Sequence, residues 1–172
     1  MRNNFMSLVF RTLFVIAVLF MSSPGFSAAP PPPGIDIAQT VIKMALEEGV
    51  SMDDAVDSMK LRANTLNFKL VAHQPLSKEL EAQGVKSRRM EIFQFCDARI
   101  ANEMVSHDMN FAAYLPCRIA MVEDQKGKPW LVMMNLDLFI QSAELPAALN
   151  KKAVFVRDTL KSIMEAGASG DL

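Results

Sequence analysis

Two apolar runs in the second half of the chain constrain the fold more than any other feature. They are CRIAMVED at 117–124 and PWLVMMNL at 129–136, and only residues 125–128 separate them. Two such runs around a short glycine-containing turn predict a β-hairpin. Upstream, FKLVAH at 68–73 and RMEIFQFC at 89–96 alternate along the chain as half-buried strands do. The sequence therefore predicts a small, mainly antiparallel sheet of about four strands.

Helical patterns interrupt these strands. Ser51 with Asp54 forms a capping-box-like start to a stripe of apolar residues at helical spacing, and Asp97 can cap a helix that ends near His107. Three further helices are predicted: an extra N-terminal helix at 36–48, a short one at 77–84 and a long C-terminal one at about 144–166. Because helices and strands do not alternate strictly, the pattern indicates an α+β fold with helices packed on the sheet.

The N-terminus has the layout of a secretory signal peptide. Positive charge at Arg2 and Arg11 is followed by an uncharged apolar run and then by small residues. We therefore divide the chain into a signal peptide at 1–27, a proline-rich spacer at 28–34 and one α+β domain at 35–172. This division predicts a periplasmic protein, whereas an uncleaved signal would anchor the chain to the inner membrane and be its only membrane contact.

Charge and motifs exclude several classes of function. Without Arg2 and Arg11 the chain carries 16 basic against 19 acidic residues and has no basic stripe, so no nucleic-acid partner is expected. It lacks the motifs of hydrolase nucleophiles, phosphate-binding loops and zinc-binding helices. We predict a non-catalytic domain without a resident cofactor. Ten methionines follow the signal, and most occupy apolar positions where Met fills a core.

The two cysteines, Cys96 and Cys117, define the candidate site. Cys96 ends one predicted strand and Cys117 begins the next, so antiparallel strands would bring both to one end of the sheet, and parallel strands would separate them. Our first expectation is a disulfide between them, or two buried thiols. A cycling redox pair is the second. The third is a copper site formed by Cys96, Cys117, His107 and Met109, because thiolate, imidazole and thioether suit copper(I).

Three segments resemble a known family. The capped helix SMDDAVDSMKLRANTLNF, the strand MEIFQFC and the segment YLPCRIAMVED are similar to the bacterial and archaeal family called domain of unknown function 302. The resemblance covers about 51–136. It implies a small α+β domain, pairing into homodimers in some members, and no assigned activity. The chain departs from the family in two places, with the predicted helix at 36–48 where relatives have a strand, and with Asp97-Ala98 where they have Asn-Pro.

Arg118 completes the candidate residues. It follows Cys117 in the segment that resembles the family, and on a strand it would point away from the cysteine. It can bind an anionic ligand, or pair with an acid such as Glu91, which we consider the simpler role. The favoured function is a binding or accessory domain for a small ligand, a metal or a partner protein near Cys96, Cys117 and Arg118. A thiol–disulfide redox protein and a structural subunit, including a homodimer, are the alternatives.

Overall fold

The computed structural model describes residues 34–171. The predicted signal peptide and nearly all of the proline-rich spacer lie outside these residues. Ile35 begins the folded unit, and no helix from there to Asp171 has the length and apolar character needed to cross a membrane.

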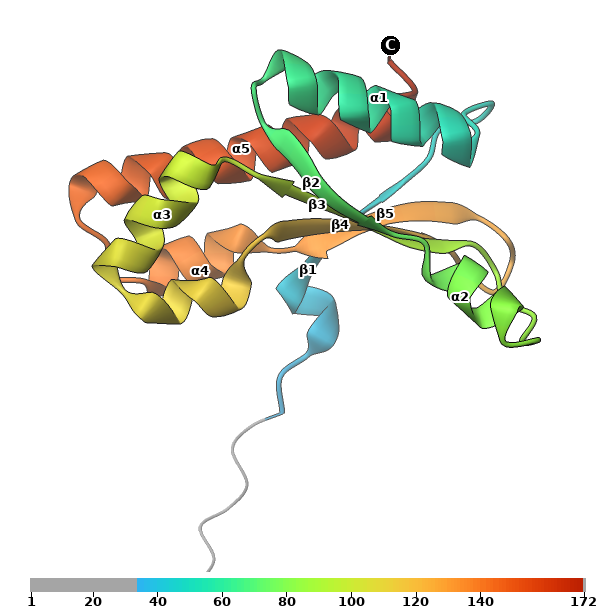
Figure 1. Ribbon diagram of the computed structural model, residues 1–172, viewed down its shortest axis with the longest axis horizontal. Helices are drawn as coiled ribbons and strands as arrows, with labels where there is room; N and C mark the ends of the chain where they lie inside the picture. The colour runs from blue at the N-terminus through green and yellow to red at the C-terminus, as the bar shows by residue number, and fades with distance from the viewer. Residues whose placement is uncertain (1–33, 172) are drawn as a thin grey trace, which may run out of the picture. The chain divides into compact units, whose positions relative to one another are not determined.

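One antiparallel sheet organises the domain (Figure 1). Its strands are β1 (Val41–Ala45), β2 (Lys69–Gln74), β3 (Met90–Cys96), β4 (Cys117–Glu123) and β5 (Pro129–Met134), in the order β1-β5-β4-β3-β2. The predicted hairpin is confirmed as β4 and β5, which pair from Glu123↔Pro129 to Ile119↔Met133. The α+β class is confirmed as well, with five strands instead of about four.

The additional strand is β1, and the helix predicted at 36–48 is wrong. Asp36 accepts a hydrogen bond from the Ala38 amide, but it caps only a short 3₁₀ turn, η1 (Ile37–Thr40). The chain then pairs along β5, with Ile42 opposite Met133. The apolar spacing in this segment fits both a helix and a strand. The segment becomes a strand because its backbone hydrogen-bonds to β5, about 90 residues later in the sequence.

Most predicted helices are present. The helical elements are α1 (Met52–Thr65), α2 (Leu76–Ala82), α3 (Ala98–His107), the 3₁₀ helix η2 (Met109–Tyr114), α4 (Leu136–Ser142) and α5 (Ala147–Ser169), and all of them except η2 and α4 were predicted. The Ser51–Asp54 capping box is confirmed, and so is the Asp97 cap of α3. The C-terminal helix starts a few residues later than predicted. The short helix α4, capped by Asn135, was not predicted.

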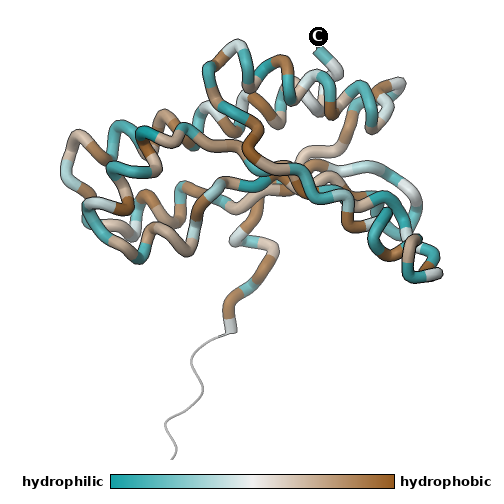
Figure 2. The backbone as a smooth tube through the Cα atoms, viewed as in Figure 1, coloured by the Kyte–Doolittle hydropathy of each residue, from teal (hydrophilic) through white to brown (hydrophobic). Residues whose placement is uncertain are grey.

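Helices α1 and α5 cover one face of the sheet (Figure 1). The hydrophobic core lies between this face and the two helices. The inward residues alternate along the strands, as in Phe93, Phe95, Ile119 and Met121, and all four are fully buried. Several methionines fill this core, as predicted: Met59, Met121, Met133 and Met164. Figure 2 shows the contrast with α2, where hydrophilic residues predominate at the edge of the domain.

Candidate functional site

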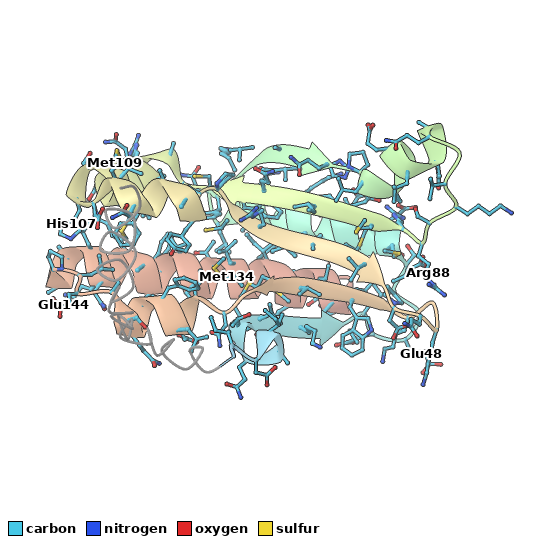
Figure 3. The ribbon with its side chains drawn as sticks, turned by 90° about the horizontal axis from the view of Figure 1, so that it is seen from below. Glu48, Arg88, His107, Met109, Met134 and Glu144 are labelled. Carbon is cyan, nitrogen blue, oxygen red and sulfur yellow. The ribbon has the colours of Figure 1, made fainter. Side chains whose placement is uncertain are left out.

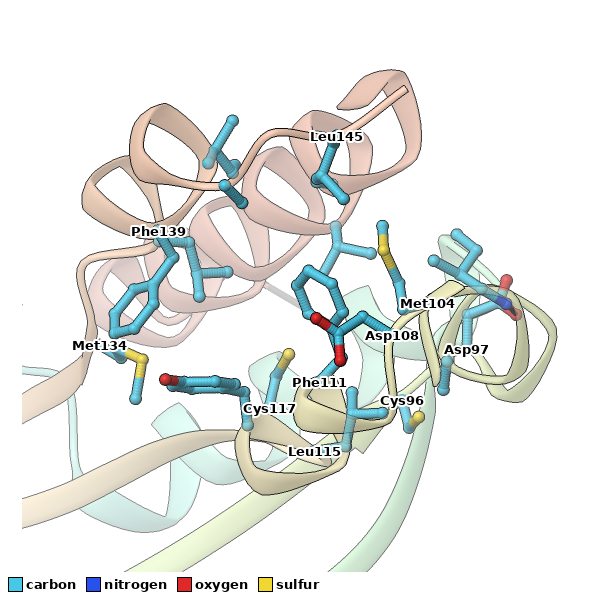
Figure 4. A pocket seen from close by; sticks show the side chains of 18 of the residues that line it. Cys96, Asp97, Met104, Asp108, Phe111, Leu115, Cys117, Met134, Phe139 and Leu145 are labelled. Carbon is cyan, nitrogen blue, oxygen red and sulfur yellow. Dashed lines mark hydrogen bonds between the residues drawn. The ribbon is translucent and has the colours of Figure 1, made fainter. Parts of the chain in front are cut away.

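A pocket of about 310 Å³ opens at the end of the sheet where β3 ends and β4 begins (Figure 4). Four helical segments surround it, namely α3, η2, α4 and α5. Its walls are almost entirely apolar and include Ile100, Met104, Phe111, Tyr114, Phe139 and Val156. A concave apolar space with few polar groups is the usual form of a small-molecule site.

Two excursions of the chain build these walls. Residues 97–116 leave β3 as α3 and η2 before returning to β4, and residues 135–146 carry α4 beyond β5. The two excursions meet where the rings of Tyr114 and Phe139 pack with centroids 4.9 Å apart. Ion pairs fasten both excursions to α5, one between Lys152 and Glu103 and one between Arg157 and Asp137. The pocket therefore lies between elements that are distant in sequence.

Both cysteines belong to the pocket wall, and the thiol of Cys117 is the one that burial affects more strongly. Burial, together with the nearby Cys96, raises its pKa to about 11, although Arg118 opposes this effect. Burial also raises the pKa of Cys96, with Asp97 adding to the effect. Both groups are therefore protonated near neutral pH, and a protonated thiol is a poor nucleophile and a poor metal ligand.

The cysteines do not form a disulfide, so that prediction is wrong for this structure. Strands β3 and β4 are antiparallel, and both cysteines do lie at the same end of the sheet. However, Cys117 is paired with Phe95 and shares its buried face, whereas Cys96 is the next residue and faces the other side. Both are free cysteines, too far apart to bridge. Figure 4 shows Cys117 and Cys96 at separate parts of the pocket wall.

The proposed copper ligands are not gathered at one point. His107 ends α3 at an exposed position, and Met109 is 77% exposed at the start of η2. Neither lines the pocket to which Cys96 and Cys117 belong. Figure 3 shows His107 and Met109 at the outer end of the domain. Within residues 34–171, no group of three or more His, Cys, Asp or Glu side chains could hold a metal ion.

Arg118 does not pair with Glu91. It is exposed and lies opposite Gln94 on the sheet face that points away from α1 and α5, whereas Glu91 points to the helical face. Arg118 is also absent from the pocket wall. The pairing with Glu91 is therefore wrong, and the binding of an anionic ligand by Arg118 stays a prediction.

The partners of Glu91 form a cluster that the sequence analysis missed. Its carboxylate contacts His73 Nε2 and Arg89 Nε, each at 2.5 Å, and Arg89 also reaches Asp53 Oδ1 at 2.8 Å. The His73 ring stacks on Phe93, with centroids 4.5 Å apart. Burial acts to raise the pKa of Glu91, but bonds from Arg89 and His73 outweigh it and lower the pKa.

A signal for this cluster was present in the sequence. In MEIFQFC, Glu91 shares its strand face with two phenylalanines, and a carboxylate on a buried face requires partners. The cluster lies outside the pocket wall, and its role in the described structure is to neutralise a buried acid.

Together, these features define a small α+β domain with an apolar pocket at one end of its sheet. The sequence profile of the family described as domain of unknown function DUF302 matches residues 42–167, and the chain belongs to this family. The match extends beyond the expected 51–136, into both β1 and α5.

A solved structure has the same fold. It is the crystal structure of an uncharacterized conserved DUF302 protein from Bacillus stearothermophilus, with a TM-score of 0.59 and 15% identity. The similarity covers 73% of this chain and 94% of that one. No curated protein matches the sequence.

Proposed function

We propose that this protein is an exported, non-catalytic binding domain whose ligand is a small, largely apolar molecule held in the pocket beside Cys117. The observation that carries the proposal is the pocket itself, about 310 Å³ in volume and lined mainly by aromatic and aliphatic side chains. Ligand sites of small molecules commonly span about 300–1,000 Å³. The volume therefore suits a compact ligand such as a medium-length alkyl chain or a molecule of about two to three aromatic rings.

The state of the cysteines favours binding over redox chemistry. Cycling thiols need a lowered pKa and a partner within bonding distance, whereas the pKa of Cys117 is raised to about 11 and Cys96 faces the other side of the sheet. In a binding domain, by contrast, a protonated thiol serves as a small apolar wall group. The same argument weighs against thiolate ligation of copper.

The structural alternative involves the other face of the sheet. That face carries half-buried apolar residues, including Ala120, Val122 and Val132. A homodimer formed there would not require the pocket. Light scattering on the purified mature protein distinguishes a dimer from a monomer. Its result does not bear on ligand binding, which is tested separately.

The test of binding uses a fluorescent apolar reporter, N-phenylnaphthylamine, with octanol as competitor. We expect saturable fluorescence with the mature protein and its displacement by octanol. Ala153 lines the pocket from α5, so Ala153→Phe should fill the space and abolish the signal. Ala148→Phe makes the same change at an exposed position of α5 outside the pocket wall and should leave the signal intact. Equal binding by the two variants would refute the proposal.

A further inference from the structure

We infer that the ligand of this pocket is amphiphilic and carries a positively charged ammonium group at one end. The inference rests on the proposed function, and it concerns the charge of the groups that frame the apolar space. Asp97 and Asp108 belong to the pocket wall, and no lysine or arginine does. Figure 4 labels both carboxylates among the lining side chains.

Both carboxylates keep an oxygen available. Oδ1 of Asp97 accepts from the amides of Arg99 and Ile100 at 2.8 and 3.2 Å, and Oδ1 of Asp108 accepts from the Asn110 amide at 2.8 Å. These bonds cap α3 and η2 and hold the carboxylates in place. In the described part of the chain, Oδ2 of neither residue has a hydrogen-bond partner, and neither residue has an ion-pair partner.

Two basic side chains of α5 near the pocket are already engaged. Lys152 is paired with Glu103, and Arg157 is paired with both Asp137 and Asp158. Arg118 is exposed and does not line the pocket. The unpaired charge at the pocket wall is therefore negative, which disfavours a ligand that carries a carboxylate or phosphate and favours a cation.

The aromatic rings add a second attraction for a cation. Phe111, Tyr114 and Phe139 line the pocket, and the rings of Tyr114 and Phe139 are in contact. The faces of aromatic rings attract ammonium groups within about 6 Å of the ring centroid. Carboxylates and aromatic rings in the wall of one pocket provide both features that hold an alkylammonium, while the aliphatic walls hold its chain.

The test compares three molecules with the same chain and different ends: octylammonium, octanol and octanoate. Isothermal titration calorimetry with the mature protein near neutral pH should rank them in that order. We expect octylammonium to bind about tenfold more tightly than octanol, a modest factor because Asp108 is exposed and water screens its charge. Octanoate should bind more weakly than octanol.

Asparagine variants remove the negative charge of each carboxylate without removing the helix cap. Because Asn caps helices as well as Asp does, Asp108→Asn and Asp97→Asn should keep η2 and α3 in place. Each should reduce the advantage of octylammonium over octanol without changing the affinity for octanol. Asp57→Asn, on the exposed side of α1, removes the same charge far from the pocket wall and should change neither affinity.

The outcomes separate the two proposals. If octanol binds and Ala153→Phe abolishes its binding, but octylammonium has no advantage or the Asn variants leave that advantage unchanged, the inference about charge is wrong and the apolar site remains. If none of the three molecules binds, the proposed function and this inference both fail.

Discussion

Gly167 is the position where the packing of α5 against α1 is most sensitive to a single methyl group. It lies inside α5, where alanine would normally be preferred to glycine by about 1 kcal/mol. A Cβ atom at this position, however, would lie 2.5 Å from Met59 Cγ, 3.0 Å from Leu131 Cδ1 and 3.3 Å from the Ala55 carbonyl oxygen. Met59 and Leu131 are fully buried, so neither side chain can move into solvent.

We therefore expect Gly167→Ala to destabilise the domain. Overpacking of a dense core costs about 1–3 kcal/mol, and the gain in helix propensity offsets up to about 1 kcal/mol of it. The net loss in the free energy of unfolding should be about 1–2 kcal/mol, measured by urea denaturation with circular dichroism. For a domain of this size, that loss corresponds to a decrease in Tm of roughly 3–8 °C.

A double-mutant cycle identifies the cause. Met59→Ala removes the atom that the new methyl group would contact and should by itself cost about 2–5 kcal/mol. In that background Gly167→Ala should become neutral or stabilising, because the helix-propensity term remains and the closest contact is gone. The coupling between the two sites should therefore be about 1–3 kcal/mol. If Gly167→Ala stabilises the wild-type protein, the close approach of the two helices is not as described.

Three further predictions concern charge, thiols and export. Glu91 has a pKa below its usual 4.5, so its contribution to stability is complete above that pH and is lost as the pH falls through the lowered pKa. Glu91→Gln should cost about 2 kcal/mol near neutral pH, and urea denaturation should show this difference from wild type shrinking as the pH is lowered below 4.5. A pKa of about 11 in place of 9.0 lowers the thiolate fraction of Cys117 about a hundredfold. Cys117 in the native protein should therefore react with iodoacetamide far more slowly than in the unfolded chain. Mass spectrometry of the unfolded, alkylated protein should count both thiols as free. The same intact mass, taken from the periplasmic fraction, should correspond to cleavage after Ser27, and an uncleaved chain in the membrane fraction would contradict that prediction.

The parts of the fold that were predicted correctly have signals within a few residues of sequence. The capping box of Ser51 and Asp54 and the turn between β4 and β5 are examples, because their hydrogen bonds join near neighbours. Strand β1 was missed because its conformation depends on pairing with β5. Helix α4 was missed because distant partners hold it in place: Asp137 pairs with Arg157 of α5, and Phe139 packs on Tyr114 of η2. Local propensity carries no information about such partners.

The cysteines show where prediction of a site from sequence stops. The ends of two strands could be predicted, and antiparallel pairing does bring Cys96 and Cys117 to the same end of the sheet. Whether they meet depends on register, because side chains alternate between faces and a shift of one residue exchanges them. The observed register places Phe95, rather than Cys96, beside Cys117. The sequence thus placed both cysteines at the end of the sheet where the pocket opens, but the disulfide expected between them is absent. The apolar walls from α3, η2, α4 and α5 could be recognised only once the chain was folded.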